Sequence, residues 1–162
     1  MKTGLKGPIV GGVSLALLVV GLGAAVIAKE SDRRAAVQNA VASVTVYKDP
    51  ACGCCSKWVE HLRENGFEVT TVDTDNLEQV MTRYGITPEL AACHTAVVDG
   101  YVIEGHVPAD LIVKLLKDHP EVAGLAVPGM PLGSPGMEGP TKEPYDVLAF
   151  DQEGRTTVYA HR

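Results

Sequence analysis

Residues 43–66 read SVTVYKDPACGCCSKWVEHLRENG, and this stretch decides the fold. Alternating β-branched and polar side chains at its start predict a short strand over residues 44–47. The turn-forming residues 49–53 follow. A helix is predicted over residues 54–65, because its apolar side chains and its two cysteines fall on one stripe of a 3.6-residue period and Gly66 ends it. A strand that passes through a cysteine-bearing turn into a helix predicts an α/β domain.

Further elements are predicted downstream. They are a strand at 67–72, a helix that begins within 73–76 and runs through residue 84, strands at 94–98 and 101–104 joined by a tight turn at 99–100, and a helix from 108 to 119. Between them, residues 86–92 are expected to be irregular or to form one helical turn. The order β-α-β-α-β-β-α is that of a thioredoxin-like α/β sandwich.

The flanking segments differ in composition from this domain. Residues 29–42 are polar and rich in alanine, which predicts a linker or a short helix. Residues 121–144 differ again: the stretch at 126–144 within them is rich in glycine and proline and is not expected to form regular structure. Residues 145–150 and 155–159 predict a hairpin at the edge of the sheet. We therefore divide the chain into residues 1–28 (signal peptide or membrane anchor), 29–42 (linker), 43–120 (thioredoxin-like metal-binding domain) and 121–162 (Gly/Pro-rich loop and β-hairpin packed on the domain).

The first residues predict export. Lys2 and Lys6 precede an uncharged run over residues 7–28, and charge returns at residue 29. A helix over residues 7–28 would be ~33 Å long, enough to span a bilayer, and the same pattern fits a cleaved secretory signal. Both alternatives stay open, and both place the rest of the chain outside the cytoplasm. We expect a periplasmic protein, soluble after cleavage or anchored to the inner membrane by residues 7–28.

Size and charge restrict the function classes. The 162 residues suffice for one domain with a modest core plus appendages. The formal net charge is -6, so the sequence lacks the cationic surface that nucleic-acid binding needs.

All four cysteines are predicted to share one site. Cys52, Cys54 and Cys55 lie at the start of the first helix, where backbone N–H groups stabilise thiolate over thiol. Thiolate is both the nucleophile of disulfide exchange and the ligand of soft metals. In a thioredoxin-like domain the loop before the third strand faces this turn, and Cys93 lies in that loop. The expected fold therefore brings Cys93 beside the other three.

Several chemistries fit four such thiols. Two structural disulfides are one alternative, although a bridge between the adjacent Cys54 and Cys55 would be strained. A four-cysteine zinc site normally has two separated C-x-x-C knuckles, which this chain lacks. Clustered thiolates that can bridge metal ions fit Cu(I) better, because soft sulfur ligands select it.

Other donor groups are weaker candidates. Met130 and Met137 supply thioethers in the Gly/Pro-rich segment, with packing on the domain an equally good interpretation. His94 and His106 flank the third and fourth strands. For each of them an ordinary solvated or hydrogen-bonded histidine is the favoured interpretation, and His94 is kept with the two methionines as a further candidate ligand.

From residue 44 to residue 138 the chain resembles the bacterial CopG-type copper-resistance proteins, a thioredoxin-like family unrelated to the DNA-binding repressor of that name. Three segments carry the resemblance: KDPACGCCSKWVEHL, ACHTAVVDGYVIEGHVPADLI and GLAVPGMPLGSPGME. It implies an exported copper-binding protein whose C-x-C-C motif and distant cysteine hold a cysteine-bridged copper cluster, here Cys52, Cys54, Cys55 and Cys93. It also implies a role in copper tolerance, with interconversion of Cu(I) and Cu(II), and does not establish turnover.

The sequence thus predicts a copper-binding protein of the bacterial envelope, holding Cu(I), whose partners are copper ions and other periplasmic copper-handling proteins. The alternative is a periplasmic thiol-disulfide oxidoreductase with Cys52 as nucleophile and Cys55 as resolving thiol. His94 stands where thioredoxins carry a cis-proline, and this weakens the alternative. A disulfide-stapled binding module without chemistry is a third hypothesis.

Overall fold

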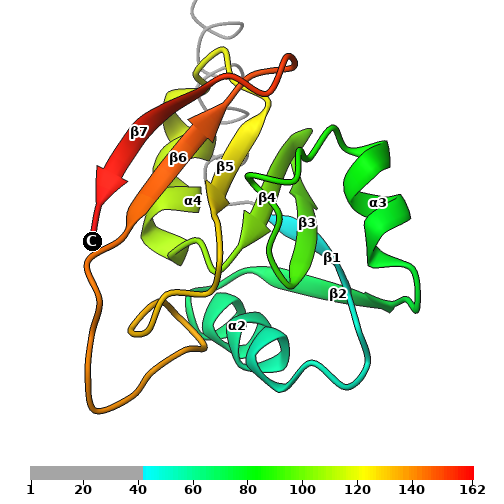
Figure 1. Ribbon diagram of the computed structural model, residues 1–162, viewed down its shortest axis with the longest axis vertical. Coiled ribbons are helices and arrows are strands. Elements are labelled where there is room, and N and C mark those ends of the chain that lie inside the picture. The colour runs from blue at the N-terminus through cyan, green and yellow to red at the C-terminus, as the bar shows by residue number, and fades with distance from the viewer. Residues whose placement is uncertain (1–41) are drawn as a thin grey trace, which may run out of the picture. The chain divides into compact units, whose positions relative to one another are not determined.

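The strand β1 (Ser43–Lys48) runs through a turn into the helix α2 (Gly53–Glu64), as predicted. The computed structural model describes residues 42–162 (Figure 1). The chain continues through these elements: β2 (Glu68–Asp73), α3 (Leu77–Arg83), β3 (His94–Val98), β4 (Tyr101–Gly105), α4 (Ala109–Asp118), β5 (Gly124–Val127), β6 (Asp146–Phe150) and β7 (Thr156–His161). The predicted order of strands and helices up to α4 is confirmed.

Within residues 42–162, seven strands form one mixed sheet in the order β2-β1-β3-β4-β5-β6-β7. The β1 strand pairs parallel with β2 and antiparallel with β3, and β3 and β4 form a hairpin. This pairing sets β1 beside β3. The turn after β1 and the loop before β3 therefore lie at the same end of the sheet, where the cysteines are.

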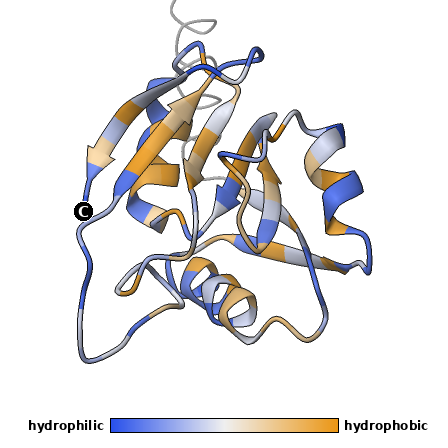
Figure 2. Cartoon of the chain, viewed as in Figure 1, coloured by the Kyte–Doolittle hydropathy of each residue, from blue (hydrophilic) through white to orange (hydrophobic). Residues whose placement is uncertain are grey.

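Alternation along the strands divides the core between the two faces of the sheet. Within β4, Ile103 joins the larger core cluster and Val102 the smaller one. The larger cluster also receives the buried side chains of α2 and α4, and the smaller receives those of residues 81–91 with Phe150. Figure 2 shows the apolar strands at the centre of this arrangement. The helix α2 is therefore fixed against the sheet by Trp58 and Leu62, each 0 % exposed.

The strand β5 corrects the sequence prediction for residues 121–144. All four of its residues are buried, and it pairs parallel with β4 and antiparallel with β6. A Cβ at Gly124 would lie 1.8 Å from the carbonyl oxygen of Val102, so this close approach needs glycine. The glycine and proline content of this region argues against a strand, and β5 forms because it pairs with β4 on one side and β6 on the other. The predicted hairpin at 145–159 is confirmed as β6 and β7, which end the sheet.

The predicted signal or anchor at residues 7–28 lies outside the described residues. Within residues 42–162, no helix has both the length and the apolar character needed to cross a membrane.

The start of α4 depends on a histidine from another helix. Pro108, its N-cap residue, has no side-chain hydrogen bond to the helix, and His61 Nε2 of α2 accepts from the Ala109 N–H at 3.1 Å. Burial is the main cause that lowers the pKa of His61, against the opposing charges of Glu138, Glu64 and Asp110. Only the neutral imidazole can accept this bond, so His61 couples the packing of α2 on α4 to pH.

We expect His61→Ala to lower the free energy of unfolding by about 1 kcal/mol at pH 8, the usual worth of an N-cap. A lowered pKa in the folded state means that the stabilisation is fully present above the unfolded-state pKa and is lost as pH falls through the folded-state pKa. Urea unfolding from pH 8 to pH 5 should therefore show a steeper decline for the parent than for His61→Ala. His119→Asn, at an exposed left-handed C-cap, is the control. Parallel pH profiles for the parent and His61→Ala would contradict this assignment.

Candidate metal centre

The first three cysteines are positioned by the N-terminus of α2. Cys52 is its N-cap residue, and Cys52 Sγ accepts from the backbone N–H of Cys55 at 3.3 Å. Ser56 Oγ adds a bond to the carbonyl oxygen of Cys52 at 3.2 Å. The partial positive charge of a helix N-terminus stabilises negative charge on sulfur. Cys52 and Cys54 are partly exposed, whereas Cys55 is 0 % exposed.

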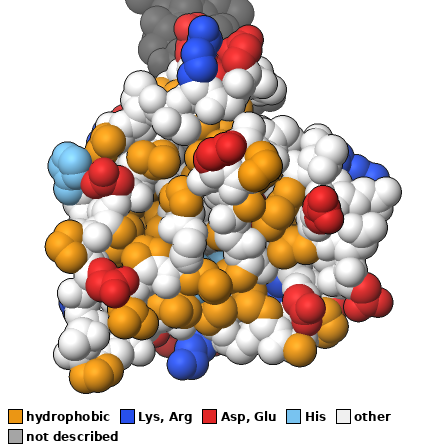
Figure 3. Space-filling model, in the orientation of Figure 1, with side chains coloured by type: hydrophobic (Ala, Val, Ile, Leu, Met, Phe, Trp, Pro, Cys, Tyr) orange, Lys and Arg blue, Asp and Glu red, His pale blue; other side chains and the backbone are white. Residues whose placement is uncertain are grey.

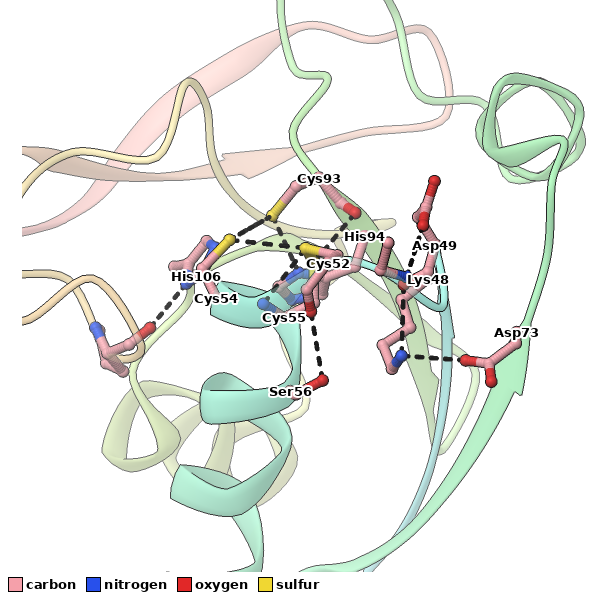
Figure 4. Close-up of a disulfide and its surroundings, with 12 residues drawn as sticks. Lys48, Asp49, Cys52, Cys54, Cys55, Ser56, Asp73, Cys93, His94 and His106 are labelled. Atoms are coloured by element: carbon pink, nitrogen blue, oxygen red, sulfur yellow. Dashed lines mark hydrogen bonds and ion pairs between the residues drawn. A yellow bond between two sulfur atoms is a disulfide. The ribbon is translucent and has the colours of Figure 1, made fainter.

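Cys93 joins them from the loop before β3. Its Sγ lies 3.9 Å from Cys54 Sγ, which in turn lies 3.5 Å from Cys52 Sγ (Figure 4). Cys55 Sγ lies 3.3 Å from the carbonyl oxygen of Cys93. The four Sγ atoms all lie within 4.8 Å of one another. The structure thus brings together all four cysteines that the sequence proposed for one site.

These separations suit a shared metal ion. Two sulfurs bound to one tetrahedral ion at ~2.3 Å lie ~3.8 Å apart. The distances of 3.5 and 3.9 Å on either side of Cys54 Sγ are close to that value. Cys54 Sγ therefore has both Cys52 Sγ and Cys93 Sγ at about the separation that ligands of one ion have. The four cysteines could therefore hold a metal.

Two of the thiols are oxidised in this structure. Cys52 and Cys55 form a disulfide, with their Cα atoms 5.4 Å apart, while Cys54 and Cys93 are free. A sulfur in a disulfide has no thiolate charge to offer a metal. Full use of the four ligands therefore requires two electrons and two protons, which convert the disulfide to two thiols.

Two histidines extend the site beyond Cys93. His106 Nε2 lies 3.0 Å and His94 Nδ1 lies 3.4 Å from Cys93 Sγ. His106 Nδ1 lies 2.6 Å from the carbonyl oxygen of Pro135. A carbonyl only accepts, so Nδ1 carries the proton and Nε2 presents a lone pair to Cys93. Metal-binding histidines commonly have their second ring nitrogen held in this way.

Burial keeps both imidazoles neutral. Desolvation, followed by the influence of His106, lowers the pKa of His94 to about 3, and desolvation also lowers the pKa of His106. The ring of His94 is 0 % exposed, at 4.3 Å from that of Trp58 between centroids, and within residues 42–162 its Nε2 has no hydrogen-bond partner. Neutral imidazoles can bind metal without first losing a proton.

Cys93 itself is a protonated thiol in this environment. Burial first, then the neighbouring Cys54, raises the pKa of Cys93 to about 12. The S–H group of Cys93 can donate to His106 Nε2. A metal that binds Cys93 must displace this proton, so ligation here exchanges a proton for a cation.

The sequence left His106 and Glu104 outside the predicted ligand set. For His106 an ordinary solvated or hydrogen-bonded histidine was the favoured interpretation, and the structure places its Nε2 3.0 Å from Cys93 Sγ. The β3–β4 ladder pairs Thr95 with Glu104 and Val98 with Tyr101 around the turn at 99–100. Continued by two residues, the same register sets His106 opposite Cys93, so the predicted Asp99-Gly100 turn already indicates that the two are neighbours. Glu104, which bonds to Ala92 and Thr95, leaves no comparable sequence signal.

Comparisons with solved structures show the family of this chain. The chain is similar to two solved structures, of copper resistance protein copG in its forms 2 and 1. Form 2 is 42 % identical, with a TM-score of 0.71, and the match covers 75 % of this chain and 98 % of that one. Form 1 is also 42 % identical, with a TM-score of 0.70 and coverage of 74 % and 96 %. The chain belongs to the CopG copper resistance protein family.

A family model described as "Protein of unknown function, DUF411" matches residues 90–137. No curated protein matches the sequence. The matched segment includes Cys93, His94, His106 and the first part of the Gly/Pro-rich segment.

The Gly/Pro-rich loop of this CopG family member packs against the cysteine helix. The backbone at Gly136 has a φ of +86°. A Cβ there would lie 2.7 Å from the Cys54 carbonyl oxygen, 3.0 Å from the Trp58 backbone nitrogen and 3.2 Å from His106 Nδ1. The neighbouring Met137 is partly buried, and Met130 is 42 % exposed. The structure thus sets the loop beside the site without recording a contact of either thioether with the four sulfurs.

Access to the site is from one open side. A shallow depression of about 410 Å³ is lined by Asp49, Ala51, Cys52, Leu77 and Cys93. Figure 3 shows hydrophobic side chains gathered over the region where the sheet approaches α2, with isolated acidic side chains around them. Small reagents can therefore approach Cys52 and Cys93, whereas Cys55 is buried.

We expect Gly136→Ala to displace the loop and release the Pro135 carbonyl from His106. Gly136 combines a positive φ with backbone contacts too short for a methyl group, so the loop must move. Gly139→Ala is the matched control, since a Cβ there meets nothing within 4 Å. The His106 ring resonances in NMR spectra should shift in Gly136→Ala and stay in place in Gly139→Ala. Unchanged His106 resonances in a folded Gly136→Ala protein would contradict the expectation.

Proposed function

We propose that this protein is an exported copper-binding protein that holds Cu(I) as a cysteine-bridged cluster and serves copper resistance. The observation that carries the proposal is the convergence of four Sγ atoms within 4.8 Å of one another. The membership of the CopG family supports copper as the metal. Copper ions are then the cargo, and other periplasmic copper-handling proteins are the proposed partners.

The donor set favours copper in its reduced state. Thiolates are soft ligands that select Cu(I), and clustered thiolates can each bridge two ions. The Cys93–His94–His106 group adds neutral nitrogen donors at the same end of the site. Met130 and Met137 are proposed as accessory thioether ligands, because the loop that carries them packs against α2.

The same residues suit a change of copper oxidation state. Thiolates select Cu(I), whereas imidazole also suits Cu(II), so a site with both kinds of ligand can bind copper in either oxidation state. Two Cu(II) ions can each take one electron from the Cys52 and Cys55 thiolates, giving two Cu(I) ions and the disulfide. A Cys52–Cys55 disulfide, as in the structure, is the oxidised product that this exchange would leave.

The second candidate function is thiol-disulfide exchange. The Cys52–Cys55 disulfide favours it, since Cys52 lines the open depression and Cys55 is buried behind it. An incoming thiolate would attack Cys52 and release Cys55 as the leaving group. Cys54 and Cys93 would have no part in this reaction, which makes the two functions separable.

We also propose that the core is thioredoxin-like. Support comes from the order β1-α2-β2-α3-β3-β4-α4, with a parallel β1–β2 pair and an antiparallel β3–β4 hairpin. The cysteine turn stands between the first strand and its helix, and β5 to β7 extend the sheet at the far edge.

A copper titration tests the main proposal. Reduced, anaerobic protein is titrated with Cu(I) against a competing chelator, followed by X-ray absorption at the copper edge. We expect more than one copper ion per chain, sulfur-dominated coordination and a short copper–copper distance. Absence of tight copper binding by fully reduced protein would refute the proposed function.

The proposed periplasmic location rests on Lys2 and Lys6 before the uncharged residues 7–28. We expect a fusion of residues 1–45 to alkaline phosphatase, which is active only outside the cytoplasm, to be active. A fusion of residues 29–45 is the matched control and should be inactive. Activity limited to a cytoplasmic reporter would overturn the location.

A further inference from the structure

A buried carboxylate lies directly beneath the Cys93 loop. Glu104 is 0 % exposed, and both of its oxygens are used. Oε1 accepts from the backbone N–H of Ala92 at 2.8 Å, and Oε2 accepts from Thr95 Oγ1 at 2.7 Å. Ala92 and Thr95 stand on either side of the Cys93–His94 pair. One side chain therefore ties down both ends of the segment that presents Cys93.

The sheet holds only the C-terminal half of this segment, since His94 and Thr95 pair with Lys48 and Tyr47 of β1. The β3 strand begins at His94, and its ladder with β4 begins at Thr95 opposite Glu104. The Ala92 N–H therefore lacks a strand partner and is satisfied by Glu104 instead. Ala92 also packs closely on the next residue of β4, since a Cβ at Gly105 would lie 2.7 Å from Ala92 Cβ. Hydrogen bonding and packing fix Ala92 together.

A carboxylate is a costly choice for this position. Desolvation is the main cause that raises the pKa of Glu104 to about 7. A buried ionisable group is weak evidence for stability, because an apolar side chain of similar volume often packs as well without the desolvation cost. What an apolar side chain could not do is hold the Ala92 N–H and the Thr95 hydroxyl at once.

We propose that Glu104 is a positioning residue that holds the Cys93 thiol against Cys54 and His106 before copper arrives. Ligands fixed in advance bind without the cost of ordering a loop. The consequence for copper rests on the proposed function, whereas the positioning of Cys93 does not.

The variants separate hydrogen bonding from charge. In Glu104→Gln the amide oxygen can accept from the Ala92 N–H and the amide N–H can donate to Thr95 Oγ1. Both hydrogen bonds are then kept without the negative charge. Glu104→Leu has similar size and can make neither bond. Phe150→Leu is a matched control for lost core packing, since Phe150 is 1 % exposed in the smaller core cluster.

The first measurement uses no copper. In the protein with the Cys52–Cys55 disulfide, Cys54 and Cys93 are the free thiols. Phenylarsine oxide binds two neighbouring thiols through one arsenic atom and so reports how well they are held together. We expect Glu104→Leu to weaken its binding about ten-fold or more, as loss of an outer-shell partner does at metal sites. Glu104→Gln and Phe150→Leu should bind it like the parent.

Two outcomes would overturn the proposal: parent-like arsenical binding by folded Glu104→Leu, or equally weak binding by Glu104→Gln. If Glu104→Leu does not fold, Thr95→Val decides, with Thr95→Ser as its control. Weaker arsenical binding in Thr95→Val, with parent-like binding in Thr95→Ser, supports the positioning role of Glu104. Parent-like arsenical binding in Thr95→Val refutes it.

The second measurement is Cu(I) affinity in the reduced protein. Glu104→Leu should lose about 10- to 100-fold, with fewer copper–sulfur contacts in the X-ray absorption spectrum, and Glu104→Gln should recover both. Unchanged copper affinity in a Glu104→Leu protein that binds the arsenical weakly would overturn the claimed consequence for copper. If the parent protein binds no copper, the proposed function fails while the arsenical measurement still decides the role of Glu104.

Discussion

Replacing Cys54 or Cys93 with serine is expected to lower the copper content of the reduced protein about as sharply as replacing Cys52. In the proposed cluster each thiolate carries part of the charge that holds the metal, and Cys54 Sγ lies 3.5 and 3.9 Å from two other sulfurs, where it can bridge. A serine hydroxyl is a hard, neutral donor that Cu(I) gains little from. We therefore expect most of the bound copper to be lost in each of the three variants.

The measurement is copper per chain after anaerobic loading and desalting, with the thiol count recorded on the same sample. Met130→Leu and Met137→Leu are the comparison variants and should lose less, because a neutral thioether binds more weakly than a thiolate. The oxidoreductase alternative gives the opposite pattern. Full copper retention by Cys54→Ser and Cys93→Ser, with insulin reduction that depends on Cys52 and Cys55 alone, would favour that alternative.

The core order of elements could be predicted because it depends on local patterns. The stripe of α2, the alternation in β1 and β3 and the Asp99-Gly100 turn each specify their own structure. The strand β5 could not be found in this way. Its residues are stable as a strand because β4 and β6 flank them and the Gly124 backbone fits closely against Val102. That information lies in the partners rather than in the segment.

The residues of the candidate site likewise differ in whether local sequence or tertiary structure reveals them. Three of the site's sulfurs lie within four residues of the sequence, and the expected thioredoxin-like fold added Cys93, because the loop before the third strand then faces the cysteine turn. His106 was considered as a donor, but its type and position alone favour an ordinary histidine; the register of the β3–β4 hairpin is what sets it opposite Cys93. Glu104 could not be recognised, since a glutamate within a strand is ordinarily expected at the solvent side. Its burial follows from the loop that folds over it, a tertiary feature.

The largest remaining effect concerns the Cys52–Cys55 disulfide, which we expect to act as a switch on metal capacity. In the oxidised protein only Cys54 and Cys93 retain thiols, with His94 and His106 beside Cys93. Two thiols and two imidazoles can hold one ion but lack the sulfurs needed to bridge several. Reduction restores the other two thiolates at the helix N-terminus, where negative charge is stabilised.

Ag(I) is the suitable probe, because it shares the preference of Cu(I) for thiolates and does not oxidise or reduce the cysteines under these conditions. We expect the disulfide form to bind at most one Ag(I) per chain and the reduced form several, by native mass spectrometry. The double variant Cys52→Ser/Cys55→Ser is the control: it cannot form the disulfide, and its low capacity should be the same before and after reductant. Equal Ag(I) capacity in the oxidised and reduced parent would show that Cys52 and Cys55 are not ligands, and the four-sulfur cluster would have to be abandoned.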